Sequence, residues 1–389
     1  MKIADRDREQ LIRWRRHLHQ YPELSFKETN TSAFVSEALK RMPFLEISRP
    51  APTAVMAVLR GRNPGKTLAI RADMDALPIE EKNTFEYRSS VPGVMHACGH
   101  DGHTAMLLTT AKLLSENKEK LSGEIRFIFQ HAEETPPGGA DELVNAGVMD
   151  GVDYVIGTHL WSPLETGKIG IVYGPMMAAP DTFKVTVIGK GGHAGLPHET
   201  IDSITAAAQT ISSLQQIVSR ATDASEQLVI SVTQIAGGSA DNVIPGSVEF
   251  GGTVRSFNEE LRNQIPGKIE QIVKGVTDAH GASYKFDYTK GYRPVINEER
   301  TTRILHQTAA GLFGEDSVTL MKPVMVGEDF SAYQQKAPGC FFFTGAGNKK
   351  EGITFPHHHA NFTIDEKALE IGVKMLTKAA EAFLSSDHE

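Results

Sequence analysis

Apolar residues recur at helical spacing in some stretches of this chain and form short β-rich runs in others. Helical spacing covers residues 5–20, residues 30–42 and the run AMLLTTAKLL that follows Thr104. Strand-like runs cover residues 54–61, 67–75, 124–130 and 153–159. This alternation predicts an α/β fold, in which helices flank a mixed and largely parallel central sheet.

Polar side chains gather where these strands are predicted to end. The second strand ends in Asp73 and Asp75, the third leads into Glu133 and Glu134, and the fourth finishes at His159. Parallel α/β sheets bind ligands at the carboxyl ends of their strands. The sequence therefore predicts one site at this edge, where the aspartate pair caps a turn or orients a neighbouring ligand.

The pattern changes near Asp181. From there to residue 294, strand-like and helix-like runs follow the order β-α-β-β-α-β, which is the order of a ferredoxin-like unit. Alternation of helix and strand then resumes. We expect an α+β domain inserted into an α/β domain, with the boundaries 1–180 and 295–389 for the outer domain and 181–294 for the insertion.

Composition limits the classes of function. The chain has 389 residues, of which 40% are hydrophobic and 23% charged, as in a soluble globular protein of two domains. A net charge of −8 argues against nucleic acid as a partner, because phosphate binding needs a basic surface. The sequence shows no membrane-spanning run and no signal-type apolar core, and two cysteines are too few for a disulfide framework. We expect a cytoplasmic protein.

The stretch His96-Ala97-Cys98-Gly99-His100-Asp101-Gly102-His103 holds three imidazoles, a thiol and a carboxylate in eight residues. Thiolate and imidazole are good ligands for zinc and similar divalent ions. We expect this stretch to lie in a loop that enters a helix. A structural zinc site or a polar loop is the alternative, but a structural site would not need the adjacent carboxylates of Glu133 and Glu134, which suit a ligand and a general base.

Several motifs together resemble the metal-dependent aminoacylase and amidohydrolase family, in the branch of hippurate hydrolases and plant auxin-conjugate hydrolases. They are HACGHDGH, QHAEE, GTHL, GGHAG, GTVRSF, GEDF and a late histidine-rich turn before a helix. The resemblance implies a catalytic domain interrupted by a lid domain that often dimerises. It also implies two divalent metal ions, with Zn, Mn, Co and Ni as candidates, and hydrolysis of the amide bond of an N-acyl-L-amino acid.

Residue by residue, the resemblance implies metal ligation by Cys98, His100, Glu134, His159 and His358, with Glu133 as general base. In the late tract, His358-His359-Ala360-Asn361-Phe362 is similar to the family's His-x-Pro-x-Phe pattern. Ala360 departs from that pattern, so His357 and His359 stay open as alternatives to His358.

Three residues of the inserted domain are candidates for contacts with substrate. His193, in the turn GGHAG, suits donation of a hydrogen bond to the oxyanion, and in relatives that dimerise it can come from the partner subunit. Asn242 and Arg255 suit the substrate's α-carboxylate. Alternatives for the whole chain are a dipeptidase or carboxypeptidase, a deacetylase of the N-acetyl-diaminopimelate type, and a metal-binding protein without catalysis.

Overall fold

The computed structural model describes residues 2–385, so Met1 and residues 386–389, the outermost parts of the predicted outer domain, lie outside the described residues. The chain divides into two compact units. The first comprises residues 2–176, 295–323 and 329–385, and the second comprises residues 177–294 and 324–328. The insertion thus begins four residues before the sequence-based boundary at 181, and it includes a short segment from later in the chain.

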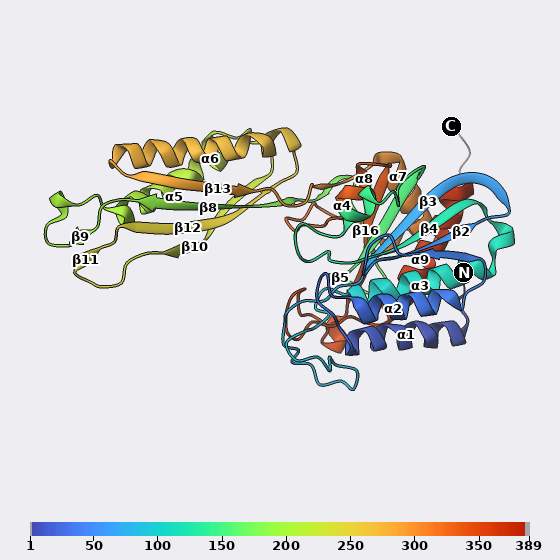
Figure 1. Cartoon of the computed structure of the whole chain (residues 1–389). Helices are drawn as coiled ribbons and strands as arrows, with labels where there is room; N and C mark the ends of the chain where they lie inside the picture. The colour runs from blue at the N-terminus through green and yellow to red at the C-terminus, as the bar shows by residue number, and fades with distance from the viewer. Residues whose placement is uncertain (1, 386–389) are drawn as a thin grey trace. The chain divides into compact units, whose positions relative to one another are not determined.

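The first unit is built on a mixed sheet (Figure 1). Its strands, in spatial order, are β1 (Leu45–Ser48), β2 (Val55–Arg60), β4 (Ser122–Gln130), β3 (Asn63–Asp73), β5 (Tyr154–Glu165), β16 (Gly339–Gly347), β6 (Ile169–Ile171) and β15 (Val318–Leu320). The central strands β4, β3, β5 and β16 run parallel, and antiparallel pairs flank them. The predicted mixed, largely parallel sheet is confirmed. The sequence patterns missed the short outer strands β1, β6 and β15, which have three or four residues each.

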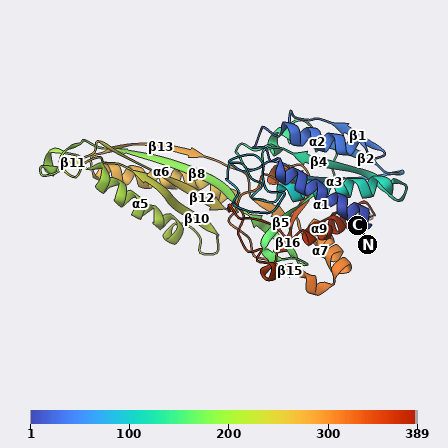
Figure 2. The same ribbon diagram turned by 90° about the horizontal axis from the view of Figure 1, so that it is seen from below.

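Helices pack on this sheet through apolar side chains. They are α1 (Asp5–Gln20), α2 (Thr29–Lys40), α3 (His100–Glu116), α4 (Ala140–Asn145), α7 (Glu299–Phe313), α8 (Ser331–Gln334) and α9 (Lys367–Ser385). Helices α3 and α9 lie against each other and against the central strands, as Figure 2 shows from below. Helix α3 is buried along nearly all its length, so buried residues, both apolar and polar, occur on every side of it. No helix within residues 2–385 is long and apolar enough to cross a membrane.

The second unit is an antiparallel sheet covered by two helices. Its elements in chain order are β8 (Ala179–Ile188), α5 (Ser203–Arg220), β10 (Leu228–Ala236), β12 (Ser247–Ser256), α6 (Glu259–Ala279) and β13 (Ser283–Thr289). The spatial strand order β10-β12-β8-β13 is that of a ferredoxin-like fold, which confirms the prediction. Both helices start at side chains that cap their first N–H groups, Asp202 for α5 and Asn258 for α6.

A small ribbon pairs β9 (Gly192–His193) with β11 (Val243–Ile244). Two more short strands, β7 (Gly174–Met177) and β14 (Val295–Asn297), lie near the sequence limits of this unit.

A buried ion pair ties together the two ends of the inserted segment. Asp181, near the start of β8, accepts hydrogen bonds from Arg262 of α6 at 2.6 and 2.9 Å and from the Tyr288 hydroxyl at 2.9 Å. It also accepts one from the backbone N–H of Gly291 at 2.9 Å, just after β13. Asp181 and Arg262 are 0% and 2% exposed, so each charge depends on the other for its stability.

Candidate metal centre

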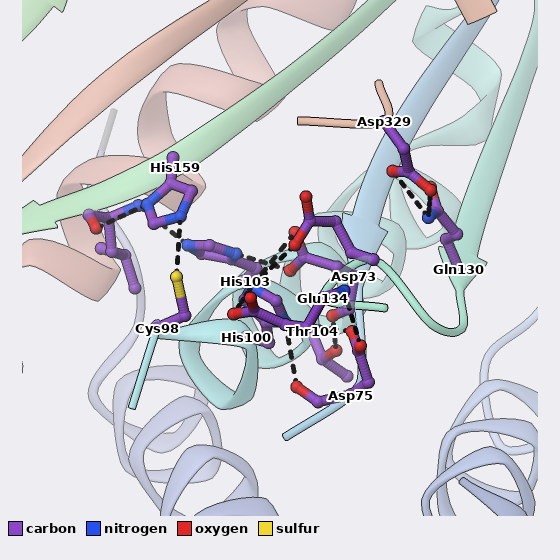
Figure 3. Close-up of polar contacts among 12 residues, drawn as sticks. Asp73, Asp75, Cys98, His100, His103, Thr104, Gln130, Glu134, His159 and Asp329 are labelled. Atoms are coloured by element: carbon purple, nitrogen blue, oxygen red, sulfur yellow. Dashed lines mark hydrogen bonds and ion pairs between the residues drawn. The ribbon is translucent and has the colours of Figure 1, made fainter. Parts of the chain in front are cut away.

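In the first unit, side chains that are distant in sequence come together (Figure 3). They lie at or next to the carboxyl ends of β3 and β4, the middle of β5 and the first turn of α3. Cys98 Sγ lies 3.4 Å from His159 Nε2. Glu134 Oε1 lies 3.7 Å from His100 Nε2 and 3.3 Å from His358 Nε2. All five side chains that the sequence nominated as metal ligands are therefore neighbours.

Two local predictions about this region were wrong. Helix α3 begins at His100, so His100 and His103 lie in its first turn rather than in a preceding loop. Gly99 makes this early start feasible, because its φ of 101° lies in the left-handed region that other residues rarely adopt. Strand β5 does not finish at His159 but continues to Glu165, because β16 pairs with it along this extension.

Hydrogen bonds leave one ring nitrogen of His100 and one of His159 facing the site. His100 Nδ1 donates to the backbone oxygen of Asp75 at 2.9 Å, and His159 Nδ1 donates to the backbone oxygen of Leu160 at 2.8 Å. In the neutral form of each ring, which is the form that binds a metal, the lone pair is therefore on Nε2. Among the described residues, the buried atoms His100 Nε2 and Glu134 Oε1 have no hydrogen-bond partner. Buried polar atoms without partners are costly, and a bound cation would satisfy both.

The charges at the site also fit a divalent ion. Burial, together with the carboxylates of Glu134 and Glu133, raises the pKa of the Cys98 thiol well above its ordinary value. Burial would lower the pKa of His100, but Asp73 and Asp75 outweigh it and raise that pKa to about 10. The site is thus rich in negative charge and needs positive charge. Ions bound there would supply it and would hold Cys98 as a thiolate.

The three histidines of the late tract have different surroundings. His357 Nε2 accepts a hydrogen bond from the backbone N–H of Ser162 at 3.2 Å. The His359 ring stacks on Phe355 at 4.5 Å, and its Nδ1 accepts a hydrogen bond from a backbone N–H two residues later. Only His358, among these three, turns a ring nitrogen toward Glu134, and its backbone φ of 63° accompanies this orientation.

Glu133 lies beside this cluster without being part of the closest contacts. Its side chain is 9% exposed, and its Oε2 lies 4.0 Å from His100 Nε2. A carboxylate near a metal site but outside the ligand set is the geometry that a general base requires.

Sequence reasoning missed a buried polar network behind Asp73. Arg71 donates hydrogen bonds to Asp73 and Asp329 at 2.8 Å each, and Gln130 donates to Asp329 at 2.7 Å. Figure 3 shows the contact between Gln130 and Asp329. The available signal was an arginine inside an otherwise apolar strand, since a buried guanidinium needs carboxylate partners. His103 was also left without a separate role; its Nδ1 donates to Asp73 Oδ1 at 2.6 Å.

The candidate substrate contacts of the second unit lie at two ends of its sheet. His193 and Asn242 are neighbours, because the backbone N–H of Ala194 donates to the backbone oxygen of Asn242 at 3.0 Å. Arg255 is near the opposite end of β12, where its Nε donates to the backbone oxygen of Met325 at 3.1 Å. Ser247, at the start of β12, is next to the β9–β11 ribbon. Arg255 lies eight positions further along this extended strand, a distance of roughly 26 Å.

A buried thiol, imidazoles and carboxylates at the strand ends of an α/β unit define the site of a metal-binding protein, in which Cys98 belongs to two groups of possible ligand atoms. The ligand atoms of Cys98, His100 and Glu134 lie within 4.8 Å of one another. The chain belongs to Peptidase family M20/M25/M40, whose model matches residues 69–382.

Similar proteins support this assignment. An N-acyl-L-amino acid amidohydrolase of Geobacillus stearothermophilus is 63% identical over 76% of this chain and 80% of its own length. Thermostable carboxypeptidase 1 of Saccharolobus solfataricus is 45% identical over 93% of this chain and 92% of its own. Among solved structures, the Bacillus subtilis YXEP protein, described as a dinuclear metal binding peptidase of the M20 family, superposes with a TM-score of 0.86 at 36% identity. It covers 99% of this chain and 100% of its own.

Proposed function

We propose that this protein hydrolyses the amide bond of N-acyl-L-amino acids, such as N-acetyl or N-benzoyl derivatives, and releases a carboxylic acid and a free amino acid. The observation that carries the proposal is the Cys98 thiol, which lies among the predicted ligands and beside Glu133. The similarity to an N-acyl-L-amino acid amidohydrolase at 63% identity supports the substrate class.

Cys98, His100, Glu134, His159 and His358 would hold two divalent ions, drawn from Zn, Mn, Co and Ni. The bound ions would lower the pKa of a shared water and polarise the substrate's carbonyl group. Cys98 lies close to His159 and also to His100 and Glu134, so its thiolate would contribute charge to both ions. Asp75 would fix the tautomer of His100, and the Asp73 carboxylate would contribute negative charge near His100 Nε2.

Glu133 would take a proton from the water as it attacks the amide carbon and deliver that proton to the leaving nitrogen. This transfer needs a carboxylate that is close to the ligands but not consumed by them. Glu133 and Glu134 are adjacent in sequence yet differ in surroundings, since Glu134 Oε1 lies 3.3 Å from His358 Nε2 whereas Glu133 Oε2 lies 4.0 Å from His100 Nε2. The two residues would therefore divide the tasks of base and ligand.

The second unit would bind the substrate and complete the site as a lid. His193 would donate a hydrogen bond to the oxyanion, while Asn242 and Arg255 would hold the α-carboxylate. Because His193 and Asn242 lie far along the sheet from Arg255, the second unit of a single chain does not bring all three side chains to one small substrate. A homodimer formed through the second unit, with His193 and Asn242 supplied by the partner subunit, would resolve this separation. We expect this assembly in the cytoplasm, where Cys98 stays reduced.

A carboxypeptidase or dipeptidase is the second candidate, because Thermostable carboxypeptidase 1 is 45% identical over 93% of this chain. The test is a panel of N-acetyl and N-benzoyl amino acids and dipeptides, assayed with and without chelator and with each added metal. Faster hydrolysis of N-acyl amino acids is the expected result. A preference for dipeptides would favour the peptidase, a preference for N-acetyl-diaminopimelate would favour the biosynthetic deacetylase, and no hydrolysis with metal bound would leave a binding protein.

A further inference from the structure

Strand β5 extends beyond the strand that pairs with one of its sides. The pairing of β3 with β5 stops at Arg71 and Gly157, whereas β5 continues to Glu165. Backbone N–H groups along a strand point to alternate sides, and the N–H of Val155 donates toward β16. The N–H groups of Leu160 and Ser162 therefore face the side that β3 no longer covers. Both residues are buried, so these groups need acceptors.

Two imidazoles occupy the place of the missing strand. The N–H of Leu160 donates to His103 Nε2 at 2.8 Å, and the N–H of Ser162 donates to His357 Nε2 at 3.2 Å. A ring nitrogen that accepts a hydrogen bond carries no proton, so in both neutral rings the proton is on Nδ1. The two histidines are thus locked as donors through Nδ1.

These two donors point at different members of the site. His103 Nδ1 donates to Asp73 Oδ1 at 2.6 Å. His357 Nδ1 lies 3.9 Å from Cys98 Sγ, within the range for a hydrogen bond to sulfur. The orientation of the His357 ring is fixed by stacking on Trp161, with ring centroids 4.7 Å apart and an interplanar angle of 26°.

We propose that His357 is a positioning residue that donates an N–H···S hydrogen bond to Cys98 and stabilises it as a thiolate ligand, without binding metal itself. The inference rests on the proposed function, because it assumes that Cys98 binds metal. A thiolate surrounded by the carboxylates of Glu133 and Glu134 gains from a fixed donor, and hydrogen bonds to a ligating sulfur tune its bond to the metal.

Two other roles for His357 are open to the same test. Its ring could serve only to cap the N–H of Ser162, or it could bind metal, since its ligand atom lies within 4.8 Å of those of Cys98 and His159. The second role would require a bare Nδ1 and a protonated Nε2. That proton would point at the N–H of Ser162, so the observed hydrogen bond would become a contact between two donors.

A pair of amide substitutions separates the three roles. In His357→Asn, the side-chain amide reaches the position of Nδ1 and can still donate to Cys98. In His357→Gln, the amide oxygen reaches the position of Nε2 and can still accept from Ser162, but the donor to sulfur is lost. His359→Gln, in the same tract but stacked on Phe355, is the matched control.

The measurements are metal affinity by chelator competition and the thiolate-to-cobalt charge-transfer absorption of the Co²⁺-loaded enzyme. We expect His357→Gln to lose about 10- to 100-fold in metal affinity, the usual effect of removing a hydrogen-bond partner of a metal ligand. We also expect it to shift this absorption. We expect His357→Asn and His359→Gln to keep the wild-type spectrum. If His357→Asn changes and His357→Gln does not, the role is capping of Ser162. If both lose one equivalent of metal, His357 is a ligand. Either result overturns the inference.

Failure of the proposed function would look different. A wild-type enzyme that binds Co²⁺ without any thiolate-to-cobalt absorption would show that Cys98 is no ligand, and this would refute both proposals together. If the variants do not fold, a long-range ¹⁵N–¹H spectrum of the wild-type histidines reads the tautomer directly. A His357 ring protonated on Nδ1 and unprotonated on Nε2 supports the inference, and the opposite tautomer refutes it.

Discussion

Adjacent glutamates allow the roles of base and ligand to be separated by one kind of substitution at two positions. Glu133→Gln replaces a carboxylate with a near-isosteric amide that cannot accept a proton. The Glu133 side chain is 9% exposed and its Oε2 lies 4.0 Å from His100 Nε2, so the near-isosteric change removes the base with little loss of packing. We expect kcat to fall by about 10² to 10⁴-fold, the usual effect of losing general base catalysis. This corresponds to about 2.7 to 5.4 kcal/mol in activation free energy.

Glu134→Gln is the matched control, because its Oε1 is buried without a hydrogen-bond partner among the described residues and lies 3.3 Å from His358 Nε2. We expect this variant to lose metal as well as turnover. The assay measures kcat and metal content by elemental analysis on the same preparations, with unfolding temperature as a check on folding. Near-normal kcat in Glu133→Gln at full metal content would refute its role as base. Metal loss equal to that of Glu134→Gln would instead make Glu133 a ligand.

Four further predictions follow from the contacts described above. Cys98→Ala should lose metal and activity together, and undiminished metal by elemental analysis would exclude Cys98 as a ligand. Arg255→Ala should raise KM for N-acyl amino acids much more than for the matching amides, whereas equal losses on both would exclude carboxylate recognition. A mixture of His193→Ala and Glu133→Gln subunits, each inactive alone, should regain activity after subunit exchange; no recovery despite proven exchange would exclude action across the interface. Asp181→Ala should lower the free energy of unfolding by about 3 to 5 kcal/mol in urea titrations, because it removes the buried carboxylate partner of Arg262 and leaves it only the exposed carboxylate of Glu259; a change below about 1 kcal/mol would contradict that account.

The sequence predicted the elements whose patterns are long or locally marked. Helix α1 covers the predicted residues 5–20, and the order of runs between 181 and 294 was enough to identify the ferredoxin-like unit. The cluster from Cys98 to His103 was recognisable because soft and basic side chains rarely gather by chance. That Glu134, after the third predicted strand, and His159, within the fourth, lie in one site followed from the geometry of parallel sheets.

Other features depend on contacts between distant segments and leave little trace in the local sequence. The end of β5 is set by its pairing with β16, a strand nearly two hundred residues later, so no local signal could show that it continues past His159. The partner of Arg71 was not predictable for the same reason, since Asp329 is 258 residues away. In the histidine tract at 357–359 the sequence favoured His358 and left His357 and His359 open as alternatives. The three differ in contacts with distant segments, which are Glu134 for His358, Ser162 and Trp161 for His357, and Phe355 for His359.

The ion pair at Asp181 has a consequence for how an interrupted domain can fold. A flexible segment of about 110 residues between two parts of one core would cost roughly (3/2)RT ln n, or about 4 kcal/mol, in loop-closure entropy. Here the N–H of Gly291 donates to Asp181 at 2.9 Å, so the two ends of the insertion meet once it has folded. The first unit then has to close only a short connection. An inserted domain whose ends are fastened together in this way can be large and still cost its host little chain entropy.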